Sequence, residues 1–232
     1  MFCHRCGNPV RAEVRFCPSC GQPLPEAASW PVAAMPSPVW VPATGVQADA
    51  GRWLGEGWAL VQADLGNYLL ISLLFFLLNG VPFIQGALIA GFHIYTIKKL
   101  AGRNPDIAEI FKGFKFFGAT LVASLLIAFF TFLGTLALII PGLVIAAMYK
   151  FTYLFIVDKR MGFWEAMKAS HNIVRNDYFG FTMFLIAAFL VNVLGFLCLI
   201  VGLMVTVPLT FAAITVAYRD LVGFERATID SL

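Results

Sequence analysis

Residues 116–149 form 34 consecutive positions without an Asp, Glu, Lys or Arg, and few folds can hold such a segment. As one straight helix it would be roughly 50 Å long, whereas the hydrocarbon core of a bilayer is about 30 Å thick. Pro141-Gly142 interrupts the run, and a lone Lys150 precedes the next charged residue, Asp158. The run therefore predicts two membrane helices joined by a tight turn at Pro141-Gly142.

A similar pattern occurs once before this run and once after it, which indicates three copies of one unit. Each copy begins with a short stretch around a Glu, continues as an uncharged run with a Gly/Pro break, and ends near a Tyr. The three Glu are Glu56, Glu109 and Glu165, and the three breaks are Gly80-Val81-Pro82, Pro141-Gly142, and Gly195 through Gly202 to Pro208. We therefore predict an all-α integral membrane domain with six transmembrane helices in three helical hairpins. The spans are predicted near 66–82, 84–98, 117–140, 142–158, 179–201 and 203–219.

The composition agrees with a chain that has lipid as its main solvent. Charged residues make up 12% of the sequence, whereas soluble domains carry about 25%. The net charge of +3 is too small to indicate a nucleic-acid partner. The first twenty residues contain no apolar stretch, so we expect no secretory signal peptide.

Basic residues predict the orientation of the spans. Lys and Arg gather before the first hairpin, between the hairpins and after the last one, whereas the three hairpin turns contain none. Cytoplasmic loops carry the excess of Lys and Arg in membrane proteins. The pattern therefore predicts a multi-pass protein of the cell membrane with its N- and C-termini in the cytoplasm.

The first 24 residues contain a metal-binding pattern. Two Cys-x-x-Cys pairs, each followed by a Gly, are separated by ten residues and comprise Cys3, Cys6, Cys17 and Cys20. Four thiolates form a closed tetrahedral site, which suits structural Zn²⁺ and leaves no open position for catalysis. Two disulfides are the alternative, but a cytoplasmic location disfavours them. Iron is a minor alternative, and His4 is expected to be a bystander.

These patterns divide the chain into four segments. We predict a zinc ribbon at 1–24, a Pro/Ala-rich linker at 25–50, the six-helix membrane domain at 51–225 and a short C-terminal tail at 226–232. The linker holds Trp30 and Trp40, which either make incidental contacts or form a short binding motif. So small a ribbon cannot bury a core, and we expect it to unfold without its metal.

Short amphipathic helices are predicted between the hairpins. Asn104-Pro105-Asp106 is a typical helix start, with Pro105 as the first helical residue. The apolar face would comprise Ile107, Ile110, Phe111 and Phe114 in this helix, and Phe163, Met167 and Val174 in a second one. Trp53 and Trp58 flank the first span as interfacial aromatics do. These faces either lie in the membrane interface or pack against the bundle.

Four polar residues within the predicted spans form the candidate intramembrane site: Lys150, His93, Asn79 and Asn192. A lysine at such depth is energetically expensive and marks a functional hypothesis, although its long side chain could also reach the headgroups. An asparagine in a span more often bonds a neighbouring helix than a substrate. No catalytic constellation can be assembled, so we expect that the protein is not an enzyme.

Two resemblances rest on these motifs. The Cys pairs with Gly7 and Gly21 resemble the double-knuckle zinc ribbons of many prokaryotic membrane proteins. Residues 136–182, with Pro141-Gly142, Asp158 and the segment 165–170 (Glu-Ala-Met-Lys-Ala-Ser), resemble a bacterial and archaeal class of six-helix membrane proteins of uncharacterised function. The membrane region of some glycerophosphodiester phosphodiesterases is similar too, but their catalytic domain has no counterpart here.

Two functional hypotheses follow. The first is a non-enzymatic membrane protein whose cytoplasmic zinc ribbon recruits or senses a partner, which we expect to be a protein. The second is a transporter, channel or lipid-handling protein that uses a cavity near Lys150.

Overall fold

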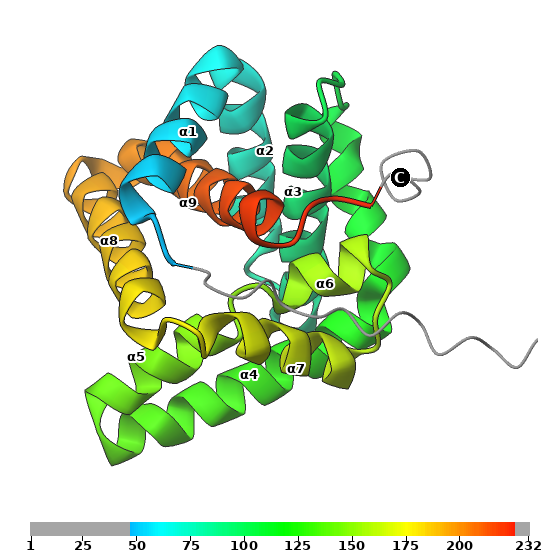
Figure 1. Cartoon of the computed structure of the whole chain (residues 1–232). Helices are drawn as coiled ribbons and strands as arrows, with labels where there is room; N and C mark the ends of the chain where they lie inside the picture. Colours follow the sequence, from blue (N-terminus) through cyan, green and yellow to red (C-terminus); the bar gives the residue numbers. More distant parts are fainter. Residues whose placement is uncertain (1–46, 226–232) are drawn as a thin grey trace, which may run out of the picture. The chain divides into compact units, whose positions relative to one another are not determined.

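The computed structural model describes residues 47–225, and the predicted zinc ribbon, Trp30, Trp40 and the C-terminal tail lie outside this range. Within it, every regular element is a helix, as the sequence predicts (Figure 1). The elements are α1 (Ala50–Ala63), α2 (Leu65–Leu78), η1 (Pro82–Ile84), α3 (Gln85–Leu100), η2 (Ile107–Phe116), α4 (Phe117–Ala137), α5 (Ile139–Met148), α6 (Thr152–Asp158), α7 (Phe163–Val174), α8 (Tyr178–Leu197) and α9 (Leu199–Leu221).

The order of these elements repeats three times. Each repeat has a short first helix (α1, η2, α7), then an outer helix (α2, α4, α8), and then a segment that ends in an inner helix (α3, α6, α9). In the second repeat this last segment is divided into α5 and α6. The threefold order of features in the sequence thus corresponds to a threefold order of helices.

The inner helices form the core of the bundle. Twelve of the 16 residues of α3 are buried, as are six of the seven residues of α6. The helix α3 contacts both α6 and α9. The rings of Phe155 in α6 and Tyr218 in α9 meet edge to face, with their centroids 5.1 Å apart.

The outer helices carry most of the exposed apolar side chains. Phe132 and Leu136 of α4 are 66% and 73% exposed, and Leu77 of α2 is 75% exposed. Phe189 and Leu194 of α8 are exposed to a similar degree. Large apolar side chains exposed in such number on three helices mark contact with another molecule or with a membrane. The outer helices therefore indicate a membrane protein.

Each first helix packs against the inner helix of the preceding repeat, so the three repeats close into a ring. The helix η2 packs on α3, α7 on α6, and α1 on α9 (Figure 1). Glycines allow two of these contacts: a Cβ on Gly57 would lie 2.8 Å from the backbone nitrogen of Ala213, and one on Gly91 only 1.8 Å from the carbonyl oxygen of Ile110. Backbones could not approach so closely with larger residues at these positions.

The six predicted spans are not all confirmed. In the described part of the chain, four helical segments are long and apolar enough to cross a membrane: Ile107–Ala137, Ile140–Asp158, Tyr178–Leu197 and Val201–Leu221. The helices α1 and α2 together form a fifth candidate, but they are bent by 99°. The helix α3 has only 16 residues and lies in the core, where its length need not match the bilayer.

The hairpin turns differ in detail from the predicted breaks. The second turn is at Leu138, which is extended, so that Pro141 and Gly142 lie in the first turn of α5. Gly142 fits there because a Cβ would lie 2.2 Å from the hydroxyl of Thr135 in the preceding helix. The third turn is at Cys198, and Pro208 lies inside the continuous helix α9 instead of at a break.

The predicted amphipathic helices mostly pack against the bundle. Met167 and Val174 of α7 are buried, and so is Trp53, which the sequence predicted at the interface. The helix η2 is a 3₁₀ helix whose N-cap is Asp106, so Pro105 precedes the helix. Its Ile110 is buried, while Phe111 and Phe114 remain exposed. Packing is thus the better interpretation for α7, whereas η2 combines a buried and an exposed apolar side.

Candidate functional site

Lys150 lies at a break inside the span Ile140–Asp158. The helix α5 ends at Met148 and α6 begins at Thr152, and the three residues between them form a turn. In this turn the N–H of Lys150 donates to the carbonyl of Ala147 over 3.2 Å. The sequence placed helix breaks only at the hairpin turns, so this break in the middle of a span corrects that expectation.

Ser170 of α7 bridges the break. Its hydroxyl donates to the carbonyl of Met148 over 2.6 Å and accepts a hydrogen bond from the N–H of Phe151 over 3.2 Å. Ser170 is fully buried, so no water can replace these bonds from outside. A hydroxyl that pairs freed backbone groups is one way in which a broken helix is tolerated in a membrane. The sequence marks Ser170 only as the end of the segment 165–170 and indicates no role for it.

The side chain of Lys150 is partly buried against apolar residues. It lines a cavity of about 10 Å³, and the other walls include Phe151, Phe181, Phe184 and Ala188. A cavity of this size holds about one water molecule. Within residues 47–225 no carboxylate pairs with Lys150. In this conformation the cavity has no room for a substrate.

His93 lies in the same part of the core. It is buried, and its Nδ1 lies 2.9 Å from the hydroxyl oxygen of Thr215 in α9. That hydroxyl donates its own hydrogen to the carbonyl of Phe211, so the network assigns the hydrogen of this contact to Nδ1 of His93. Thr215 follows Ile214, a residue that lines the cavity at Lys150. His93, one of the four predicted polar residues, thus joins α3 to α9.

Asn192 and Asn79, the other two, make their contacts elsewhere. Asn192 of α8 donates to the hydroxyl of Thr210 in α9 over 2.7 Å, a bond between the two helices of one hairpin. Asn79 caps the C-terminal end of α2 at the first hairpin turn. Its side-chain oxygen is buried without a hydrogen-bond partner among the described residues. Asn192 therefore fits the packing role that the sequence favoured for it.

Asp158, which the sequence indicates only as the end of a span, is a buried carboxylate. It accepts hydrogen bonds from the hydroxyl of Tyr218 and from the N–H of Glu225, each over 3.0 Å. The ammonium of Lys159 lies 3.3 Å from it. These contacts join the ends of the inner helices α6 and α9. In the sequence, the signal for this role of Asp158 is its position at the end of an apolar run.

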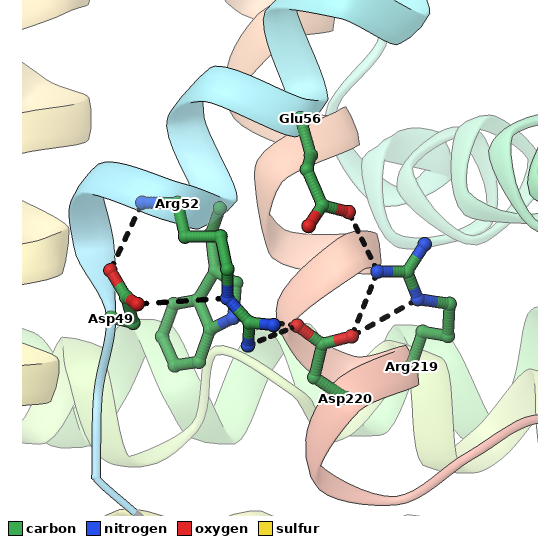
Figure 2. A network of polar contacts seen from close by, with 6 residues as sticks. Asp49, Arg52, Glu56, Arg219 and Asp220 are labelled. Atoms are coloured by element: carbon green, nitrogen blue, oxygen red, sulfur yellow. Dashed lines mark hydrogen bonds and ion pairs between the residues drawn. The ribbon is translucent and has the colours of Figure 1, made fainter.

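A polar network joins α1 to the end of α9 (Figure 2). Arg219 reaches Glu56 over 2.7 Å and Asp220 over 2.8 Å, while Arg52 reaches Asp220 over 2.7 Å. The indole N–H of the buried Trp53 donates to Asp220 over 3.1 Å. Partly exposed ion pairs contribute little stability each, so the network chiefly fixes how α1 lies on α9.

The same type of contact recurs where η2 packs on α3. Lys98 of α3 pairs with Glu109 of η2 over 2.8 Å. As with Glu56 and Arg219, a Glu of a first helix meets a cation near the end of the preceding inner helix. In two of the three repeats, the Glu near the start of the repeat thus pairs with a cation of the preceding inner helix.

The predicted zinc ligands lie outside the described residues. Among residues 47–225, no group of three His, Cys, Asp or Glu side chains could hold a metal ion, and Cys198 is free and exposed. The donor set in the first twenty residues is different in kind, since Cys3, Cys6, Cys17 and Cys20 supply four thiolates in two close pairs. That set fits tetrahedral Zn²⁺.

Comparison with known proteins supports this division. Residues 2–24 match the zinc-ribbon domain, which confirms the N-terminal ribbon and implies zinc binding. Uncharacterised proteins of Mycobacterium bovis and Mycobacterium tuberculosis are 30% identical to the chain over 122 residues. The match covers 53% of this chain but only 37% of either relative. No solved structure matches the chain.

The ribbon and the apolar helices together define the class of protein. A zinc-ribbon domain precedes a helical bundle with four candidate spans and an apolar outer surface. The ribbon and these helices therefore indicate a membrane protein, and the candidate spans are compatible with a multi-pass topology.

Proposed function

We propose that the protein is a non-enzymatic integral membrane protein whose zinc ribbon recruits or senses a protein partner in the cytoplasm. The observation that carries this proposal is the N-terminal module, since residues 2–24 match a zinc ribbon, and a closed site of four thiolates needs no catalytic residues. The cavity at Lys150, of about 10 Å³, is too small for a substrate. The bundle is then the anchor, and the ribbon carries the interaction.

Structural zinc is part of this proposal. Cys3, Cys6, Cys17 and Cys20 would hold the ion, which would fold the ribbon without taking part in a reaction. A linker of roughly 25 residues would let the ribbon search the space near the membrane. With so small a basic excess in the ribbon, a protein is a better partner than a nucleic acid.

The topology belongs to the same proposal. Six spans in three hairpins would place both termini and the basic segments between hairpins in the cytoplasm. The exposed leucines of α2 support a lipid-facing first span, although α2 has only 14 residues. Local thinning of the bilayer or tilt of its neighbours would accommodate such a short helix.

Cys198 provides a direct test of the topology. It is exposed and lies at the third hairpin turn, which the proposal places outside the cell. A membrane-impermeant thiol reagent should label it in intact cells, and the Cys198→Ser variant should remain unlabelled. Labelling only after the membrane is broken would contradict the proposed orientation.

Proximity labelling from the ribbon tests the recruiting role. We expect a set of neighbours that disappears in the Cys17→Ser/Cys20→Ser variant, because the ribbon would no longer fold around zinc. The Cys198→Ser variant, which leaves all four ligands in place, is the matched control and should keep every neighbour. If no neighbour depends on the ribbon, the recruiting role is wrong.

One observation favours the alternative of a transporter, channel or lipid-handling protein. The break between α5 and α6 lies in the middle of a span, and discontinuous helices often mark the binding sites of transporters. A water-filled path to Lys150 would be required. The variant Ala147→Cys, made in the Cys198→Ser background, should then react with polar thiol reagents. Under the leading proposal it stays unreactive, as the background variant does.

A further inference from the structure

A groove between α5 and α7 is far larger than the cavity at Lys150. Its volume is about 330 Å³. It begins at the end of α5, beside the break that Ser170 bridges, and follows α7. The residues that line it are Met148, Tyr149, Trp164, Met167, Lys168, His171 and Asn172.

The polar side of the groove is cationic. Trp164, Lys168 and His171 lie at positions i, i+4 and i+7 of α7, which places them on one face of the helix. The ammonium of Lys168 lies 5.5 Å from the centre of the Trp164 ring. No acidic residue lines the groove, and in the part of the chain that the structure describes no carboxylate pairs with Lys168. The groove therefore favours an anion.

The other side of the groove is apolar. Met148 and Met167 line it, and Met167 is almost fully buried. Methionine side chains adapt to flexible apolar groups. Trp164 is half exposed, as is typical of an aromatic residue at a membrane surface. A ligand that fits both sides needs an anionic group beside an apolar chain.

We propose that this groove binds the phosphate-bearing headgroup of an anionic phospholipid. Lys168 and Asn172 would contact the phosphate, and the two methionines would contact the glycerol and the first carbons of the acyl chains. The volume suits a headgroup but not two whole chains, which would stay in the bilayer. A soluble phosphate would use only the cationic side and would leave the apolar side without a ligand.

This proposal goes beyond the recruiting role of the ribbon. It requires that the bundle lies in a membrane, but it does not require any partner of the zinc ribbon. The assay below contains no such partner, so its failure and the failure of the recruiting role are separate results.

Lipid titration followed by native mass spectrometry tests the groove. The full chain in a mild detergent would be titrated with phosphatidylglycerol and with phosphatidylcholine of the same acyl chains. We expect tighter binding of phosphatidylglycerol, and a loss of about five- to tenfold in its affinity in Lys168→Gln, because one charge-assisted hydrogen bond is removed. Lys168→Arg should keep most of the affinity.

Lys115→Gln is the matched control, since Lys115 is an exposed lysine near the end of the equivalent first helix η2. Its affinity should stay within about twofold of the original chain. Equal affinity for both lipids, or equal losses in the two glutamine variants, would overturn the proposal. Glycerol 1-phosphate that binds as tightly as the lipid would overturn the assignment to a phospholipid. Thermal unfolding in the same detergent checks that Lys168→Gln is folded.

Discussion

The inner helix α3, which is uncharged up to Lys98, and the uncharged outer helix α4 have opposite surroundings. Twelve of the 16 residues of α3 are buried, whereas only three of the 21 residues of α4 are. Glycines and alanines let α3 approach its neighbours closely, while α4 presents Phe129 and Phe132 to the outside. The comparison teaches that hydrophobicity alone identifies membrane helices but does not tell which of them form the core.

The inner helices also differ from the outer helices in how their polar side chains are paired. In the inner helices, His93 pairs with Thr215 of α9, and Asp158 pairs with Tyr218 of α9 and with the segment that follows α9. Lys150 differs from them, since it lies at the break before α6 and, within residues 47–225, has no acidic partner. Substitutions in the two sets of helices should therefore have very different effects.

The largest effect is expected from Gly91→Ala in α3. The new Cβ would lie 1.8 Å from the carbonyl oxygen of Ile110, so α3 and η2 would have to separate. We expect a loss of about 3 kcal/mol or more in the free energy of unfolding, or no folded protein at all. Gly118→Ala in α4, where nothing lies within 4 Å, is the control and should be neutral or slightly stabilising. Thermal unfolding in detergent compares the two variants, and equal stability would contradict the close contact.

Ser170→Ala should have the next largest effect. Two hydrogen bonds would be lost, and the backbone groups of Met148 and Phe151 would be left unpaired, at a cost of about 1–3 kcal/mol in the free energy of unfolding. Ser72→Ala is the matched control, because Ser72 is also fully buried but its hydroxyl has no partner among the described residues. Denaturant titrations in which both variants lose the same stability would show that Ser170 does not support the break.

Lys150→Met should leave stability unchanged or raise it by about 1 kcal/mol, because the charge lies against apolar residues and has no carboxylate partner among the described residues. Lys98→Met provides the contrast, since it breaks the mostly buried ion pair with Glu109, which keeps only its pair with Lys112, and should cost about 1–2 kcal/mol. The melting temperatures of the two variants measure the difference. A strong destabilisation by Lys150→Met would show that the lysine has a structural partner.

The smallest effect is expected from Phe132→Leu on the outside of α4. The side chain is 66% exposed, so the substitution should change the free energy of unfolding by less than about 0.5 kcal/mol. Phe92→Leu in α3 should cost about 1–2 kcal/mol, because its ring stacks on Phe211 with the centroids 4.5 Å apart. Unfolding curves recorded in parallel test this difference, and similar losses would mean that α4 has a protein neighbour in the bundle.

Features that depend on local sequence were predicted well. The order of helices, the cysteine pairs and the approximate hairpin turns follow from charge patterns, spacing and Gly/Pro positions, which act over a few residues. The break at Lys150 was missed because no Gly or Pro marks it there. It depends on Ser170, which is twenty residues later in the chain and supplies the missing hydrogen bonds.

The sequence by itself determined the zinc ribbon, the helical class and the apolar character of the runs, because ligand spacing and hydropathy are properties of neighbouring residues. Only the tertiary structure decided which helices are inner and which are outer, and it closed the three repeats into a ring. It also placed Lys150 at the break that Ser170 bridges and formed the groove at Lys168. The physical reason is that a buried contact depends on which distant backbones can approach, and small residues such as Gly57 and Gly91 reveal their role only when the opposing helix is in place.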